Sequence, residues 1–212
     1  MLLNLPQYLY FLFGLAIFSI VFGLKNRTLF SKIVGLFFIL LLINEFICNA
    51  IPNSDVDYNF WYPVEFTFYC WFLYTYMIFK YKRTLLIIQF FVLLYCYSYN
   101  ILNWEKLSAF YTFGYSINIL VLFIFVIIKT YELLTDENDI RFPFKIPLVW
   151  FLLGLFFNLF SFLIFGMKNY IVEKNYNLYI LLQHYNQLLS SLQYVCFIIY
   201  FYCSWKFQNW NL

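Results

Sequence analysis

Residues 44–66 read NEFICNAIPNSDVDYNFWYPVEF, and this stretch joins the end of one apolar run to the start of the next through a short acidic loop. Glu45 and Glu65 lie inside the two apolar runs, about one or two helical turns from the loop. An ionisable side chain at that depth is costly, so it marks either a binding site or a buried polar contact. The pattern of apolar run, polar loop and apolar run repeats along the chain.

The composition indicates an integral membrane protein. Of the 212 residues, 65% are hydrophobic and 11% are charged, whereas soluble domains carry about 25% charged residues. Apolar runs that can cross a bilayer need roughly 20 helical residues, and seven occur here, at approximately 5–24, 30–51, 61–80, 84–103, 108–131, 147–167 and 178–204. We therefore expect an all-α polytopic membrane protein, a seven-transmembrane-helix bundle forming one domain over residues 1–212, with no soluble domain.

Basic residues in the short loops predict the orientation of the bundle. They gather in the first, third and fifth loops and the tail, at Lys25, Arg27, Lys32, Lys80, Lys82, Arg83, Lys129, Arg141, Lys145 and Lys206. The other loops carry only Lys106, Lys168 and Lys174. This distribution predicts an outside N-terminus and a cytoplasmic C-terminus in the bacterial cytoplasmic (inner) membrane.

The partners expected from the sequence are the lipid bilayer and a cytoplasmic protein. Residues 80–84 and 135–146 lie in the predicted cytoplasmic loops and carry charged side chains, so we expect a protein partner to bind there. No direct nucleic-acid binding is expected, because the sequence offers no basic groove. The sequence leaves a homo-oligomer open.

Several polar side chains are predicted to share the outer half of the bundle. Glu45, Glu65 and His184 lie at similar depths from the outer ends of their runs, and other polar residues lie beside them or nearer mid-depth. We expect these groups to turn inward, because a polar side chain facing lipid costs on the order of 1 to 3 kcal/mol. The candidate ligand or polar-core residues are Glu45, Glu65, His184, Gln183, Gln187, Asn44, Asn118 and Asn158.

Two interpretations of the Glu45, Glu65 and His184 cluster stay open. The cluster binds a ligand, proton or cation from the outside, or the acids are hydrogen-bonded to Asn, Tyr and His side chains and fix the helix register. His184 is either a hydrogen-bonded core residue or a metal ligand, and one histidine with two glutamates makes an incomplete zinc site. We expect no metal and no cofactor.

No catalytic motif is present in the sequence. It contains no G-x-S-x-G, no H-E-x-x-H and no Gly-rich phosphate loop. The last apolar run has no lysine for a retinal Schiff base, and a single histidine is too few for a ceramidase-like zinc hydrolase. We therefore expect a protein that is not an enzyme. A lipid hydrolase that uses the two acids and His184 is a third interpretation.

Four segments carry a resemblance to a known kind of protein: LLINEF (41–46), FWYPVEF (60–66), PLVWFLLGLFFNLFSF (147–162) and LYILLQHYNQLLSSLQYVCF (178–197). They resemble the signature stretches of uncharacterised small bacterial seven-span membrane proteins. The matching positions are Glu45, Glu65, Pro147, Trp150, Gly154 and His184. In size and composition the chain is also similar to the membrane accessory proteins of type VI-B CRISPR systems.

Two functions are weighed on these grounds. The first is a non-enzymatic membrane accessory or effector in a bacterial antiviral defence pathway, which acts on the membrane or on a cytoplasmic partner. The alternative is a seven-helix sensor or carrier that binds a small ligand or cation in the outer-half polar pocket.

Overall fold

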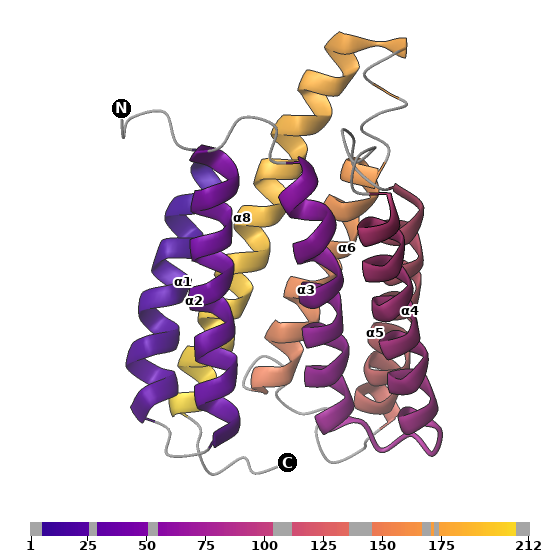
Figure 1. Ribbon diagram of the computed structural model, residues 1–212. Helices are drawn as coiled ribbons and strands as arrows, with labels where there is room; N and C mark the ends of the chain where they lie inside the picture. Colours follow the sequence, from indigo (N-terminus) through magenta and orange to yellow (C-terminus); the bar gives the residue numbers. More distant parts are fainter. Residues whose placement is uncertain are drawn as a thin grey trace. The chain divides into compact units, whose positions relative to one another are not determined.

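The computed structural model describes residues 6–25, 29–50, 55–103, 112–135, 146–166, 171 and 174–206, and within these ranges the regular structure is helical throughout (Figure 1). The helices are α1 (Gln7–Lys25), α2 (Leu29–Ala50), α3 (Asp55–Tyr76), α4 (Lys82–Leu102), α5 (Thr112–Thr135), α6 (Pro147–Gly166) and α8 (Tyr176–Lys206). The all-α prediction is confirmed for the described residues.

Three of the described helices are long and apolar enough to cross a membrane, namely Lys82–Leu102, Phe113–Thr135 and Tyr176–Lys206. The segments Gln7–Phe22 and Pro147–Ser161 are apolar but shorter. These lengths and compositions are consistent with a membrane protein. The seven passes and the orientation stay predictions.

The chain forms two compact units. Unit 1 comprises Met1–Phe46 and Asp139–Leu212, and unit 2 comprises Ile47–Asn138. The helices of unit 1 are α1, most of α2, α6 and α8, and those of unit 2 are α3, α4 and α5. Each unit is described by itself.

Helix α8 organises unit 1 and packs against both α6 and α1. The Phe197 ring of α8 stacks on Phe151 of α6 with centroids 4.8 Å apart, and it lies 5.3 Å from Phe38 of α2. All three rings are fully buried. Gly154 lets α6 approach closely, because a Cβ atom there would lie 2.6 Å from Cε1 of Phe197. An aromatic layer therefore joins three of the helices of unit 1.

Helix α8 is longer than a membrane crossing requires. Its 31 residues span roughly 46 Å at about 1.5 Å per residue, whereas the hydrocarbon core is about 30 Å thick. In Figure 1 its N-terminal turns extend beyond the neighbouring end of α1. The Phe22 ring of α1 and the Trp205 ring of α8 lie 5.2 Å apart near the other end.

Unit 2 is a three-helix arrangement in which α3 packs against both α4 and α5. Tyr115 of α5 meets α3 edge-on, with its ring centroid 5.1 Å from that of Tyr62 and 5.6 Å from that of Phe66. The sequence places the third helix at 61–80, but α3 covers Asp55–Tyr76. Side chains from α4 hold its polar first turns, and side chains from α5 bind the backbone where it ends, as described below.

All five cysteines are buried, namely Cys48, Cys70, Cys96, Cys196 and Cys203. This confirms the interpretation of these residues as small buried hydrophobic side chains.

Candidate functional site

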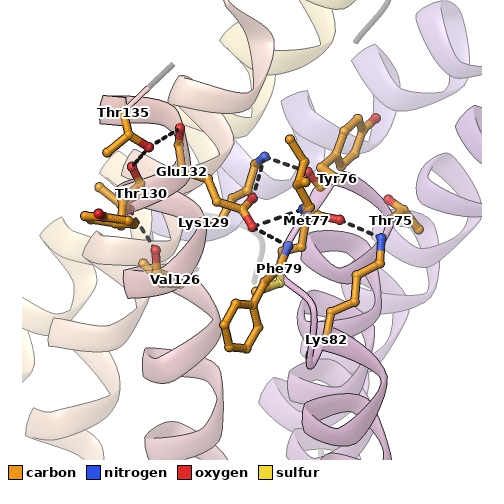
Figure 2. Close-up of polar contacts among 12 residues, drawn as sticks. Thr75, Tyr76, Met77, Phe79, Lys82, Val126, Lys129, Thr130, Glu132 and Thr135 are labelled. Carbon is orange, nitrogen blue, oxygen red and sulfur yellow. Dashed lines mark hydrogen bonds and ion pairs between the residues drawn. The ribbon is translucent and has the colours of Figure 1, made fainter. Parts of the chain in front are cut away.

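A buried ion pair at one end of unit 2 holds the turn between α3 and α4 (Figure 2). In α5, Lys129 Nζ lies 3.0 Å from Glu132 Oε2, and the two side chains are only 6% and 14% exposed. Lys129 also donates to the carbonyl of Tyr76 at 2.5 Å. Glu132 Oε1 accepts hydrogen bonds from the backbone N–H groups of Ile78 at 3.0 Å and Phe79 at 2.7 Å. The pair therefore provides hydrogen-bond partners for backbone groups that have no partner within the helix where α3 ends.

Lys82 completes the contacts of this turn. Its Nζ donates to the carbonyl of Met77 at 2.5 Å and lies 5.1 Å from the centroid of the Tyr74 ring. Cations near a helix C-terminus also compensate the negative end of the helix dipole. Two lysines and one glutamate thus fix the backbone on both sides of residue 78.

The fixed backbone carries an exposed cationic surface. We call residues 78–84 the cationic turn. Lys80, Tyr81 and Arg83 are exposed, and Ile78 is 82% exposed. The predicted partner segment 80–84 therefore begins directly after the backbone groups that the Lys129–Glu132 pair binds, at residues 76, 78 and 79. Most of the other predicted segment, 135–146, lies outside the described residues.

A buried amide network joins the three helices of unit 2. Gln89 of α4 donates through Nε2 to Thr67 Oγ1 at 3.0 Å and to Asn118 Oδ1 at 2.8 Å. Asn118 in turn donates to the Gly114 carbonyl at 2.8 Å. Both amide residues are fully buried. The predicted polar-core residue Asn118 is thus a cross-link between α4 and α5.

A second cross-link compensates a proline inside α3. Pro63 has no N–H, so it cannot donate to the carbonyl of Asn59 four residues earlier. Asn100 of α4 supplies a donor instead, with Nδ2 at 2.8 Å from that carbonyl. Tyr97, one turn earlier in α4, donates from its hydroxyl to the Phe60 carbonyl at 2.9 Å. These two bonds hold the first turns of α3 against α4.

The two predicted acids are buried in different units, and each meets a tyrosine. Glu45 in unit 1 is 7% exposed and accepts a hydrogen bond from the Tyr8 hydroxyl at 3.0 Å. Glu65 in unit 2 is 4% exposed and accepts one from the Tyr69 hydroxyl at 2.8 Å. Each carboxylate therefore has a hydrogen-bond donor within its own unit. Asn44, next to Glu45, is half-buried.

The predicted polar residues of α8 lie toward the surface of unit 1. Gln183 and His184 are exposed and Gln187 is half-buried. His184 and Gln187 line a cavity of about 640 Å³ whose other wall is the start of α1. Within the described ranges, no three or more His, Cys, Asp or Glu side chains gather closely enough to hold a metal ion.

Asn158 lies fully buried on α6. Neither atom of its amide finds a hydrogen-bond partner among the residues that the structure describes. One turn later, Ser161 donates to Asn186 Oδ1, and its Oγ lies 3.2 Å from that of Ser190. A polar contact therefore joins α6 to α8 beside an amide without partners.

Sequence reasoning missed the residues that do most of the bonding in unit 2. Glu132, Gln89 and Asn100 were not among the candidates, and Lys129 counted only as a basic residue of a loop. One signal points to the ion pair, because Lys129 and Glu132 are three residues apart at the end of an apolar run. No local signal points to Gln89 or Asn100.

Comparisons with protein-family models, curated proteins and solved structures found no match to this chain.

Proposed function

We propose that the chain is a non-enzymatic membrane accessory protein that binds a cytoplasmic protein partner through the cationic turn. The observation that carries this proposal is the Lys129–Glu132 pair, which fixes the backbone of a turn whose outward side chains are exposed. A surface that is already ordered loses less conformational entropy on binding than a loose loop does. A turn that the Lys129–Glu132 pair already holds in place is therefore well suited to bind a partner.

The proposed setting is a seven-span bundle in the bacterial cytoplasmic membrane, with the N-terminus outside and the C-terminus in the cytoplasm. The basic residues of the cationic turn and Lys129 gather at one end of unit 2. Lys and Arg next to membrane spans favour the cytoplasmic side. This placement makes the cationic turn accessible to cytoplasmic proteins.

The exposed side chains indicate the chemistry of the partner. Lys80 and Arg83 offer positive charge, and Ile78 and Tyr81 offer apolar and aromatic contact area beside it. Arginine and tyrosine are enriched in protein interfaces, and complementary charge raises the rate of encounter. The expected partner is a protein with an acidic surface that carries an apolar residue at its centre.

The pathway proposed for this activity is bacterial antiviral defence, on the basis of the resemblance to accessory proteins of RNA-targeting systems. Expression together with such a nuclease should change phage plating or the membrane potential relative to the nuclease alone. If neither readout changes, the defence assignment is wrong, while the contact surface can still be tested by itself.

Crosslinking inside cells tests the contact surface. A photoreactive phenylalanine analogue in place of Tyr81 should give one discrete protein adduct, because the exposed ring position faces the partner. The double variant Lys80→Glu and Arg83→Glu should remove this adduct. The matched control is the double variant Lys32→Glu and Lys206→Glu, since it also reverses two charges at exposed positions that are predicted on the same side of the membrane.

The outcomes separate the proposal from simple charge effects. Loss of the adduct in the Lys80→Glu and Arg83→Glu variant but not in the control supports the cationic turn as the binding surface. An adduct that persists unchanged in the Lys80→Glu and Arg83→Glu variant overturns it. Equal losses in this variant and in the control would assign the effect to net charge and would also contradict the proposal.

A further inference from the structure

A cavity of about 640 Å³ lies between the start of α1 and the N-terminal half of α8 in unit 1. Pockets that bind small molecules typically enclose about 300 to 1,000 Å³. The residues from α8 recur every three or four positions, so they form one face of that helix. The residues from α8 are His184, Gln187, Leu188, Ser191, Leu192 and Val195.

The first two α8 residues that line the cavity, His184 and Gln187, are polar, and Gln7 of α1 also lines it. Within the described part of the chain, these three side chains make no hydrogen bond. The Ser191 hydroxyl, in contrast, already donates to the carbonyl of Gln187 at 2.8 Å. Two amides and an imidazole thus remain able to bind a ligand that both donates and accepts hydrogen bonds.

The rest of the lining is mostly apolar and is open at the side. It consists of Phe11, Leu188, Leu192 and Val195, with Ser191 among them. Phe11 is 41% exposed and Leu188 is 54% exposed, so an apolar chain can enter laterally from lipid. From His184 to Val195 the face extends about 16 Å at about 1.5 Å per residue. A face of this length can contact the headgroup of an amphiphile near His184 and its apolar tail near Val195.

The charge of the lining restricts the class of headgroup. Among the described residues, the lining contains no Lys, Arg, Asp or Glu, so these residues offer no fixed charge to pair with a charged headgroup. A charge taken out of water without a partner is costly. An uncharged headgroup with hydroxyl groups matches the amides and the imidazole.

We infer that this cavity binds a single-chain amphiphile with an uncharged, hydroxyl-bearing headgroup, of which a monoacylglycerol is the simplest case. The glycerol hydroxyls bond to Gln7, His184 and Gln187, and the acyl chain lies along Leu188, Leu192 and Val195. Gln7 and His184 lie near the outer ends of the predicted first and seventh spans, which is the depth of lipid headgroups. The inference rests on the membrane setting proposed above and does not depend on the cationic turn.

Photolabelling tests the site on the purified full-length chain in lipid nanodiscs. The probe is a monoacylglycerol with a diazirine midway along its acyl chain, and labelled peptides are identified by mass spectrometry. Labelling should saturate, should be competed by unlabelled monoolein, and should map to residues 188–195 of α8. Oleate and lysophosphatidylglycerol, which carry negative charge, should compete at least tenfold more weakly.

Two variants of the cavity lining and one matched control test whether labelling depends on the cavity. Leu192→Trp fills the apolar part of the cavity and should reduce labelling of α8 by about tenfold or more. Gln187→Leu removes one polar contact and should weaken competition by monoolein about fivefold, the effect of one hydrogen bond. Leu153→Trp is the control, because Leu153 has the same 37% exposure as Leu192 but lies on α6, outside the cavity.

Several results would overturn the inference. Labelling spread evenly over lipid-facing helices, or labelling that monoolein cannot compete, would show only lipid surrounding the protein. Equal labelling of the wild type and Leu192→Trp would exclude the cavity. Stronger competition by the anionic amphiphiles would contradict the uncharged headgroup. Unchanged helicity by circular dichroism shows that each variant is folded before it is compared.

Discussion

The bond between Asn100 and the carbonyl of Asn59 gives the sharpest test of how unit 2 is built. Pro63 cannot donate to that carbonyl, and the Asn100 amide replaces the missing donor at 2.8 Å. Asn100→Leu removes this donor. Restoring an N–H at position 63 through Pro63→Ala gives the carbonyl its regular helical partner again. The two substitutions should therefore compensate one another.

The magnitude follows from the polar atoms involved. Loss of a donor to a buried carbonyl costs about 1 to 3 kcal/mol, although hydrogen bonds between helices in membranes average about 0.6 kcal/mol. Asn100 Oδ1 is buried without a partner among the described residues, and leucine removes that cost. Asn100→Leu alone should therefore destabilise by no more than about 1 kcal/mol. The quantity that tests the compensation is the coupling energy, which is the difference between the effects of Asn100→Leu in the two backgrounds. We expect Asn100→Leu to lower the free energy of unfolding by about 1 kcal/mol more in the wild-type background than in the Pro63→Ala background.

The assay is a double-mutant cycle on the free energy of unfolding, measured by titration with sodium dodecyl sulfate in mixed micelles and followed by circular dichroism. Tyr97→Phe is the matched control. Its hydroxyl bonds to the Phe60 carbonyl, and Pro63 does not remove the regular donor of that carbonyl, which is the N–H of Val64. Tyr97→Phe should cost the same in both backgrounds. If Asn100→Leu also costs the same in both backgrounds, within about 0.5 kcal/mol, the compensation does not exist.

Three further predictions concern other contacts. Glu132→Gln should speed amide hydrogen exchange at Ile78 and Phe79 by tenfold or more, because it weakens the charged acceptor of both N–H groups; unchanged exchange would show that the pair does not hold the turn. Gly154→Ala should destabilise unit 1 by about 1 to 3 kcal/mol, since its Cβ would lie 2.6 Å from the ring of Phe197, whereas Gly14→Ala should be tolerated because its nearest neighbour lies at 3.7 Å. Asn158→Leu should leave the free energy of unfolding unchanged or raise it, because neither amide atom has a partner in the described part of the chain; a loss above about 1.5 kcal/mol would contradict this.

The apolar runs of the sequence predict the positions of most helices closely. The expected ranges 84–103 and 147–167 correspond to α4 at Lys82–Leu102 and α6 at Pro147–Gly166. Long apolar runs between polar loops determine these helices locally. The third helix was misplaced because its first turns are polar. Contacts of Asn100 and Tyr97 with the backbone stabilise them, and no local pattern reveals a partner 41 residues away in sequence.

Depth along the predicted spans groups Glu45, Glu65 and His184 from their distances to loop ends, but it does not say which residues are their partners. One of the two interpretations expects Asn, Tyr and His side chains as partners of the acids. The hydrogen bonds shown for the two acids come from tyrosines, Tyr8 and Tyr69. Tyrosine is so frequent in this chain, with 21 residues, that its presence near an acid carries no signal. The partner of a buried acid depends on helix rotation, which apolar runs of uniform composition do not specify.

Buried and exposed polar side chains in this protein call for different explanations. Asn100, Lys129 and Glu132 each bond to a backbone group that Pro63 or the end of α3 leaves without a helical partner. These hydrogen bonds explain why the three side chains are polar although they are buried. Substituting them should therefore mainly lower the free energy of unfolding. Gln7 and His184 bond to no such backbone group, yet they line a cavity whose other lining residues are mostly apolar. Because folding does not account for their polarity, substitutions at these two positions should affect ligand binding far more than stability, and this difference separates a binding site from a structural contact.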